Sequence, residues 1–117
     1  MIKNKFQRGE DVVFNVNTTH IEGYTAETEV QLVLYPADLD LSKESSAAKI
    51  VVLEPVTDES NLVFTFGHEQ TATAPTGEYS LELVYTINNI RSIMKSERCF
   101  TLEDSATVHI SNDGEGE

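Results

Sequence analysis

Three histidines and one cysteine are the residues of this 117-residue chain best suited to metal binding or nucleophilic catalysis. His20, His68 and His109 lie far apart, and no pair has the spacing that places two ligands on one face of a helix. Cys99 has neither a neighbouring ligand nor a second cysteine with which to form a disulfide. We therefore predict no metal centre and no cofactor, and we expect Cys99 to be a small packed side chain.

The acidic segment DLDLSKE, residues 38–44, offers carboxylates that could suit calcium. It lacks the glycine and the regular ligand spacing of an EF-hand loop. The sequence therefore favours a solvated acidic loop, with weak calcium binding as the alternative.

No pattern typical of covalent or phosphate chemistry is present. Nucleophilic catalysis needs Ser, Thr or Cys beside a base that a third group orients, and the chain has no Gly-x-Ser-x-Gly turn. The six glycines are scattered singly, so no phosphate-binding loop is expected. We predict that the protein is not an enzyme. A small hydrolase is the alternative, and a cleft of carboxylates or histidines with shifted pKa values would reveal it.

The net charge of −12 constrains the partners. Nucleic-acid binding needs a basic surface, and no window approaches the length of a membrane span, so we predict neither kind of partner. The 39% hydrophobic content suits one folded domain. The few basic residues gather in two zones that could guide docking to acidic partners, with a solvated surface as the alternative. These zones are Lys3, Lys5 and Arg8, and Arg91, Lys95 and Arg98.

Residues 1–8, MIKNKFQR, are predicted to form an N-terminal arm that binds a neighbouring protein. Apolar Ile2 and Phe6 stand among the basic Lys3, Lys5 and Arg8, so the arm combines apolar and charged contacts. An unanchored terminus is the alternative. We expect deletion of residues 1–8 to leave a folded domain that no longer enters its assembly. No apolar stretch follows these positive charges, so we expect no signal peptide and synthesis inside the producing cell.

Alternation of apolar and polar residues, enriched in β-branched and aromatic types, predicts strands along most of the chain. Such strands pack one side against a core and turn the other to water. The expected strands and their inward residues are EDVVFNVN with Val12, Phe14 and Val16; TEVQLVLY with Val30, Leu32 and Leu34; KIVVLEPV with its alternating aliphatics; and NLVFTFG with Leu62, Phe64 and Phe66.

Residues 75–105 are predicted to form a long hairpin with Asn88-Asn89 as its two-residue turn, because Asn tolerates a positive φ. This turn would pair Ile87 with Ile90, Tyr85 with Ser92, Leu83 with Met94, and Glu82 with Lys95. We expect the inward residues to be Tyr79, Leu81, Leu83, Tyr85 and Ile87 on the first strand and Ile90, Met94, Phe100 and Leu102 on the return strand. Ser96 and Arg98 do not fit this inward row, so we expect a β-bulge near residues 95–97.

These segments together predict an all-β protein, an immunoglobulin-like antiparallel β-sandwich of about seven strands over residues 9–111. Residues 36–48 are expected to be a loop that holds a short strand or one helical turn. The last strand is expected through Val108 and Ile110, and residues 112–117 are expected to form a flexible acidic tail.

Sugar-binding sandwiches usually present exposed aromatic platforms. This chain has no Trp, and most of its Phe and Tyr residues fall at inward positions, where a core role is the default. Tyr24, in a predicted loop, is the exception. A carbohydrate-binding module is therefore kept only as an alternative.

The order of landmarks over residues 8–106 resembles the immunoglobulin-like domains of tailed-bacteriophage virion proteins, in particular the N-terminal domain of upper baseplate proteins. The shared landmarks are RGEDVVFNV, with its strand-opening Gly-Glu, then EVQLVLYPAD, NLVFTFGHEQT, APTGEYSLELVYT, with its Gly-x-Tyr step, and RCFTLEDSA. The resemblance carries over no catalytic residue.

This resemblance implies a non-enzymatic structural protein of a bacteriophage virion that is made in the host cytoplasm and acts by protein–protein docking. A capsid decoration protein, a head fibre or a tail-associated component would fit, and its partners would be other capsid or tail proteins, with repeated copies or a homo-oligomer. The chain ends just past the resembling domain, which favours a stand-alone component. The alternative is a secreted bacterial β-sandwich module that binds carbohydrate or protein.

Overall fold

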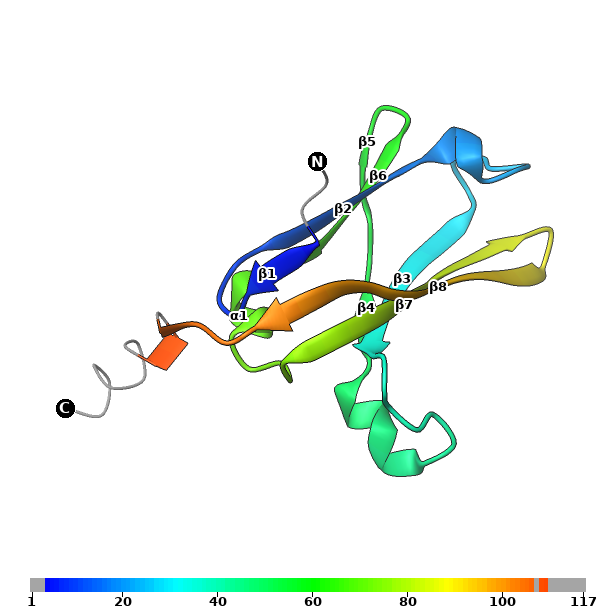
Figure 1. Ribbon diagram of the computed structural model, residues 1–117. Helices are drawn as coiled ribbons and strands as arrows, with labels where there is room; N and C mark the ends of the chain where they lie inside the picture. The colour runs from blue at the N-terminus through cyan, green and yellow to red at the C-terminus, as the bar shows by residue number, and fades with distance from the viewer. Residues whose placement is uncertain (1–3, 107, 110–117) are drawn as a thin grey trace.

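The computed structural model describes residues 4–106 and 108–109, and these form a two-layered β-sandwich (Figure 1). The alternating segments identified above supply its strands, because alternation lets one side of each strand enter a shared core. The strands are β1 (Lys5–Gln7), β2 (Val12–Asn17), β3 (Glu29–Pro36), β4 (Val51–Leu53), β5 (Val56–Asp58), β6 (Asn61–Phe66), β7 (Gly77–Ile87) and β8 (Ile90–Glu103). The short helices are η1 (Thr18–His20), η2 (Glu44–Lys49) and α1 (His68–Thr71).

The strands form a five-stranded sheet in the order β1-β8-β7-β3-β4 and a three-stranded sheet in the order β2-β6-β5. An immunoglobulin sandwich has strands B, E and D in one sheet and C′, C, F and G in the other, and β2-β6-β5 and β4-β3-β7-β8 follow those orders. The predicted all-β, immunoglobulin-like fold is therefore confirmed. The described residues contain eight strands, one more than expected.

The additional strand is β1, which pairs in parallel with residues 101–103 of β8. It lies within the stretch that the sequence assigned to an arm, so the sandwich begins at Lys5 and not at residue 9. A three-residue strand is too short to show an alternation pattern, which is why the sequence did not reveal it.

The core fills the space between the two sheets, and the inward residues expected of the four shorter strands contribute most of it. Aromatic rings dominate one end of the core. There Tyr79 stacks on Phe100 with ring centroids 5.1 Å apart, and Phe6 meets the edge of Phe100 at 6.0 Å. The fully buried side chains at this end also include Phe66 and Leu102.

The register of the β7–β8 hairpin is the one predicted. Glu82 lies opposite Lys95, and Asn88 and Asn89 both have positive φ, as a tight two-residue turn requires. The pairing slips between Leu81 opposite Ser96 and Tyr79 opposite Phe100, so β8 carries two more residues than β7 at this point. A bulge is therefore present, slightly later than expected, over residues 97–99.

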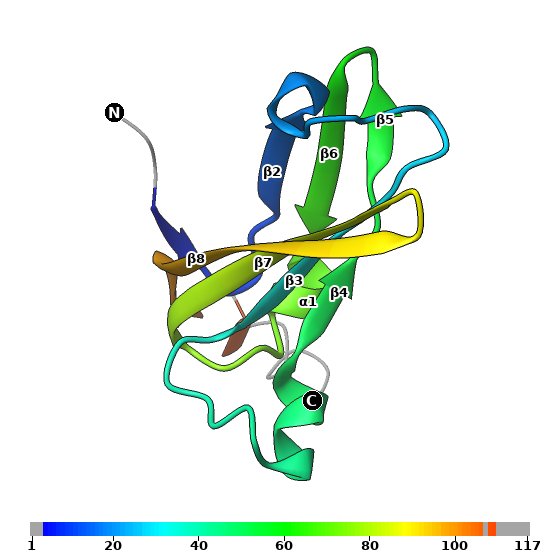
Figure 2. The same cartoon turned by 90° about the vertical axis from the view of Figure 1, so that its right-hand side faces the viewer.

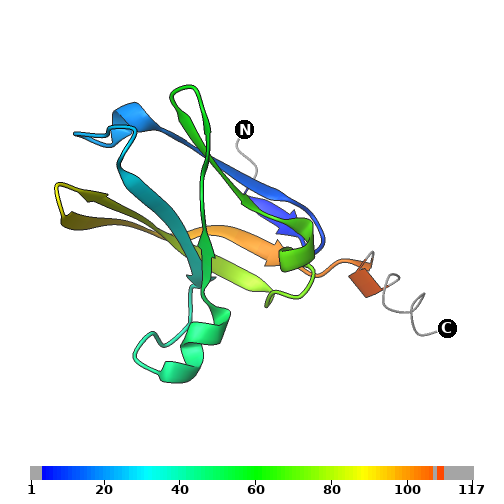
Figure 3. The ribbon, with the colours of Figure 1, turned by 180° about the vertical axis from the view of Figure 1, so that it is seen from behind.

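Two residues of the return strand were wrongly expected to be buried. Ile90 is 68% exposed and Met94 is 44% exposed, whereas Phe100 and Leu102 are buried as expected. Figures 1 and 3 view the sandwich from opposite sides, and in both views the turn end of the hairpin extends past the three-stranded sheet. The alternation pattern places both side chains on the inward side. The sheets diverge there, so Met94 lines an open groove between them and Ile90, at the hairpin turn, is left exposed.

The remaining elements differ from expectation in part. Residues 36–48 do contain one helical segment, η2, which projects from one end of the molecule together with the loop before it (Figure 2). Val108 is helical, so the last strand expected through it is wrong, and Ile110 and the predicted tail lie outside the described residues. The stretch Thr-Val-His-Ile alternates like a strand, but the end of β8 that precedes it already pairs with β1 on one side and β7 on the other.

Tyr79 joins the start of β7 to the loop before it. Its hydroxyl donates a hydrogen bond of 2.6 Å to the carbonyl oxygen of Pro75, four residues upstream. This is the tyrosine corner typical of immunoglobulin-like folds, found where the sixth of their strands begins. Burial raises the pKa of Tyr79 to about 12, so the hydroxyl remains a donor throughout the neutral range.

The Tyr79→Phe variant should unfold more easily, because it leaves the Pro75 carbonyl without its donor. We expect a loss of about 1–3 kcal/mol in the free energy of unfolding, measured by urea denaturation. Tyr85→Phe is the matched control, since no hydrogen bond is recorded for the Tyr85 hydroxyl in the described chain. Equal stability of the two variants would show that the corner contributes nothing.

Tyr79 should also make unfolding sensitive to alkali. Its pKa is about 12 in the folded state against the ordinary tyrosine value of 10.0, so the folded state keeps this proton to higher pH than the unfolded state. Its stabilising effect is complete below about pH 10 and is lost as the pH rises towards 12. Urea unfolding across this range should therefore show a steeper loss of stability for the wild type than for Tyr79→Phe. Parallel curves would contradict the assignment.

Candidate functional site

The outward side of the five-stranded sheet is the surface with the most distinctive chemistry, and we call it the open face. Its residues stand at the positions that alternate with the core residues, and the pairing of β8, β7, β3 and β4 aligns them in rows. The open face consists of Arg91, Ile93 and Lys95 on β8, Glu82, Val84 and Thr86 on β7, Glu29, Gln31 and Val33 on β3, Val52 on β4, and Glu54 directly after β4.

Apolar side chains run across the middle of the open face. Ile93 on β8 is 56% exposed and Val52 on β4 is 52% exposed, while Val84 between them is buried. If this side of the sheet faced only solvent, polar side chains would be expected at these positions in so acidic a protein. An exposed apolar strip with a polar rim is typical of an interaction surface.

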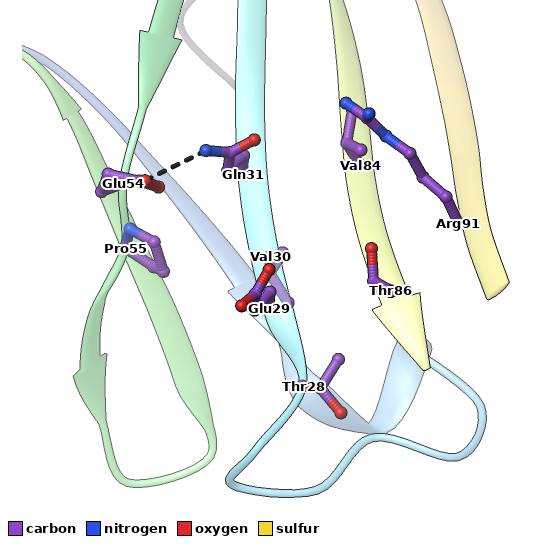
Figure 4. Close-up of a pocket in the computed structure, with 9 residues that line it drawn as sticks. All are labelled: Thr28, Glu29, Val30, Gln31, Glu54, Pro55, Val84, Thr86 and Arg91. Carbon is purple, nitrogen blue, oxygen red and sulfur yellow. Dashed lines mark hydrogen bonds between the residues drawn. The ribbon is translucent and has the colours of Figure 1, made fainter. Parts of the chain in front are cut away.

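A shallow depression of about 660 Å³ lies at one end of the open face, between the edges of β4 and β8 (Figure 4). Gln31 donates a hydrogen bond of 3.0 Å to Glu54 on one side of it. On the other side the long side chain of Arg91 extends from β8 towards Val84 (Figure 4). The residues that line the depression are Thr28, Glu29, Val30, Gln31, Glu54, Pro55, Val84, Thr86 and Arg91.

The charges of the open face are separated by strand. The β8 column carries two cations, Arg91 and Lys95, whereas the other three columns carry only carboxylates, those of Glu82, Glu29 and Glu54. Arg91 and Glu29 flank Thr86 in one row, and neither forms an ion pair or a hydrogen bond that is recorded among the described residues. Two opposite charges in one row are thus free to meet charges of a partner.

The other end of the open face is closed. Tyr35 is buried there although it stands at an outward position, and the loop that contains Leu39 and Leu41 contributes to its cover. The Lys95 ammonium lies 5.9 Å from the centre of the Tyr35 ring, an arrangement that favours a cation–π contact. The accessible part of the open face therefore ends near Lys95.

The bulge in β8 sets this boundary. Arg98 has a φ of 51°, and its backbone N–H donates a hydrogen bond of 3.0 Å to the buried hydroxyl of Ser80. Its guanidinium bonds Asp38 at 2.7 Å and Glu78 at 2.9 Å. The bulge thus turns Arg98, which did not fit the inward row, away from the core and attaches the loop after β3 to β8.

A second depression, of about 380 Å³, lies between the two sheets near β2, and we call it the interlayer groove. Phe14 and Val16 of β2 face Leu81 and Met94 of the hairpin across it. The groove exists because the two sheets diverge towards the hairpin turn and no strand closes the gap. Its lining is mostly apolar, and Lys95 and His20 are its ionisable members.

Two of the five predicted arm residues, Phe6 and Arg8, are held by the fold. Phe6 packs on the core, and Arg8 donates to the carbonyl of Ala72 at 2.7 Å and to Asp104 at 3.0 Å. Lys5 is exposed on β1, and Ile2 and Lys3 lie outside the described residues. Binding of a partner by these residues stays a prediction, but removal of residues 1–8 would also remove β1 and the Arg8 contacts. The deletion therefore tests the fold as well as the arm.

The chemistry excluded from the sequence has no visible counterpart in the described chain. No group of three or more His, Cys, Asp or Glu side chains there is placed to hold a metal ion. His68 and His109 each pair with one aspartate, Asp11 at 2.9 Å and Asp104 at 3.0 Å. No helix among the described residues is long and apolar enough to cross a membrane.

The acidic segment 38–44 uses its carboxylates internally. Asp40 accepts hydrogen bonds from the backbone N–H and the hydroxyl of Ser42, and the hydroxyl contact is the main cause of a lowered pKa for Asp40. Asp38 is engaged by Arg98. Calcium would have to compete with both arrangements, which favours the solvated loop over the calcium alternative.

The sequence did not predict the open face, because alternation within single strands identifies the inward row and does not show which outward rows lie side by side. Its signal was nevertheless present. Val33, Val84 and Ile93 interrupt the outward rows of their strands with apolar side chains, where a simple one-sided sheet would carry polar ones.

No protein-family model matches this chain, and no curated protein has a significantly similar sequence. The open face and the fold are therefore the basis of the functional proposal.

Arg98 allows the bulge to be tested. A positive φ is strained for alanine but not for glycine, and both substitutions remove the bonds to Asp38 and Glu78. We expect Arg98→Gly to be more stable than Arg98→Ala by about 1 kcal/mol in urea unfolding. If alanine were tolerated as well as glycine, the left-handed conformation at residue 98 would be wrong.

Proposed function

We propose that this protein is a non-enzymatic docking module that binds another protein through the open face. The observation that carries the proposal is the apolar strip from Ile93 to Val52, together with its separated charges and with Arg91, which has no ion pair recorded among the described residues. The depression beside it is wide and shallow, a shape that suits a flat protein surface better than an enclosed small molecule.

The proposed setting is a bacteriophage virion, in which the module serves as a capsid decoration, head-fibre or tail-associated component. This part of the proposal rests on the resemblance of residues 8–106 to immunoglobulin-like virion domains and on a fold of the same class. A small acidic sandwich suits such a role, because its net charge of −12 keeps free copies apart in solution while one face can still be attractive.

Carbohydrate binding is the second candidate, and one observation favours it. The depression offers Gln31, Glu29 and Glu54 as hydrogen-bonding groups for hydroxyls. Its lining contains no aromatic ring on which a sugar could stack. Protein docking is therefore the better explanation of the open face.

Genetic complementation tests the docking function. A phage that encodes this chain would be grown without the gene and supplied with the protein from a plasmid, and its purified particles would be analysed by mass spectrometry. Wild type should enter the particles. Ile93→Asp should reduce incorporation at least about tenfold, because it places a charge in the apolar strip.

Val13→Asp is the matched control, since Val13 is 51% exposed on β2 of the other sheet. It should enter particles as wild type does. Absence of the wild-type protein from particles would contradict the virion setting. Normal incorporation of Ile93→Asp would contradict docking through the open face, and binding of the wild type to a glycan array would support the second candidate.

A further inference from the structure

We infer that the free edge of β8, at residues 90–96, binds an extended segment of another protein in which apolar and acidic residues alternate. The segment would add a strand to the five-stranded sheet and place its apolar side chains in the interlayer groove. This inference goes beyond the proposed function, which concerns the outward surface of the same sheet.

The first half of β8 has a strand on one side only. β1 pairs with residues 101–103, so in the described chain residues 90–96 pair with β7 and with no other strand (Figure 1). The three-stranded sheet has a matching edge, because β2 has β6 on one side and no described strand on the other. In an immunoglobulin sandwich, strand A covers this side of strand B. Two uncovered strand edges thus border the interlayer groove.

The backbone of this edge is ready to pair with an added strand. In a tight two-residue turn the flanking residues, here Ile87 and Ile90, exchange hydrogen bonds, and bonded pairs then alternate along an antiparallel ladder. The N–H and C=O groups of Arg91, Ile93 and Lys95 therefore point away from β7. No backbone partner is recorded for them among the described residues. Such a row is the template on which β-augmentation builds.

The groove behind the edge favours apolar side chains in the added strand. Ile90 and Met94 are the exposed inward residues on the β8 side. Phe14 and Val16 form the wall on the β2 side and are only half-buried, whereas Phe64 on the neighbouring β6 is fully buried. A strand beside residues 90–96 would turn every second side chain into this space of about 380 Å³. Apolar residues at those positions would cover both walls.

The outward residues of the added strand would lie beside cations. Residues 90–96 contain Arg91 and Lys95 and no Asp or Glu. Lys95 stands opposite Glu82 and lies 3.7 Å from Glu97, whereas no ion pair of Arg91 is recorded within the described chain. Opposite charges on neighbouring strands stabilise their pairing. Carboxylates are therefore favoured at the outward positions of the added strand, above all beside Arg91.

The same cations disfavour a second copy of this chain as the occupant. An antiparallel pair of two such edges centred on Ile93 would set Arg91 opposite Lys95 of the other copy, and like charges directly opposite destabilise a sheet. Cationic side chains on an exposed edge are a common device against self-pairing. The net charge of −12 also keeps copies apart. The occupant is thus a segment of a different protein.

A peptide titration followed by NMR tests the inference. The probe is a nine-residue peptide, blocked at both ends, in which valine and glutamate alternate. At physiological salt, where distant charges are screened, it should shift the backbone N–H signals of Arg91, Ile93 and Lys95 together with the methyl signal of Met94. A peptide with lysine in place of glutamate should bind at least about tenfold more weakly. The net charge alone would predict the opposite preference, so preference for glutamate identifies the edge.

Two substitutions at position 93 separate the backbone from the side chain. Ile93→Pro removes the N–H that faces the added strand, and proline is tolerated at edge positions whose N–H points away from the sheet. It should weaken binding of the valine–glutamate peptide about tenfold. Ile93→Ala also loses the isoleucine side chain but keeps the N–H, and it should bind within about twofold of wild type.

Three further variants test the groove and the charge. Met94→Asp places a carboxylate in the groove and should weaken binding of the valine–glutamate peptide about tenfold. Val13→Asp, on the other sheet, should leave binding unchanged. Arg91→Glu should abolish the preference between the two peptides. Unchanged backbone spectra away from the edge would show that each variant is folded.

The outcomes separate this inference from the proposed function. Equal or tighter binding of the lysine peptide, undiminished binding by Ile93→Pro, or no shifts at about 2 mM peptide would each overturn the strand-binding edge. Shifts confined to Val33 and Val84 would place the peptide on the open face and overturn it as well. None of these results bears on the particle experiment. Normal incorporation of Ile93→Asp would in turn remove docking through the open face and leave peptide binding at the edge intact.

Discussion

The bulge in β8 is the constraint on which the rest of the structure depends. Two additional residues are accommodated opposite Ser80, whose hydroxyl accepts the backbone N–H of Arg98 and thereby satisfies a donor that the ladder has lost. Beyond the bulge, Phe100 enters the core and stacks on Tyr79, so that end of the sandwich is closed. Before the bulge, the strand follows the hairpin away from the second sheet. One irregularity therefore seals the aromatic core and also ends the accessible part of the open face near Lys95.

Polar contacts hold the closed end together, and they connect parts that are distant in sequence. Thr71 is fully buried at the end of α1, where its hydroxyl donates to the carbonyl of Glu10 and accepts from the N–H of Gly9. Arg8 bonds the next residue of the same turn, Ala72, and also Asp104 after β8. The described part of the predicted arm is thus held to the fold by β1 and by Arg8. The docking surface that we propose is instead the open face, the outward side of the five-stranded sheet, opposite the side that packs on the second sheet.

The sequence predicted the parts of the fold that local rules govern. Asn88-Asn89 determined the hairpin register, and the misfit of Arg98 in the inward row indicated that a bulge must exist. The position of the bulge depends on the hydrogen bond between Arg98 on β8 and Ser80 on β7. Alternation within one strand does not predict such a contact between two strands. Alternation also assigns Ile90 to the inward face of the sheet, but it does not show whether a second sheet covers that position. In the structure Ile90 is exposed. The candidate site was predictable only in its components, because the separation of charge between β8 and the other strands becomes visible when the strand order is known.

An apolar strip on a strongly acidic sandwich allows the protein to dock through one face while its free copies stay apart. The central claim is that a partner protein docks on the strip that runs from β8 to β4, and transferred cross-saturation NMR with purified particles that lack this protein tests it most directly. The methyl signals of Ile93, Val84, Val33 and Val52 should lose intensity together when the particles are irradiated, while those of Val13 keep their intensity. Intensity losses confined to Met94 and the interlayer groove, or no losses at all, would contradict the account.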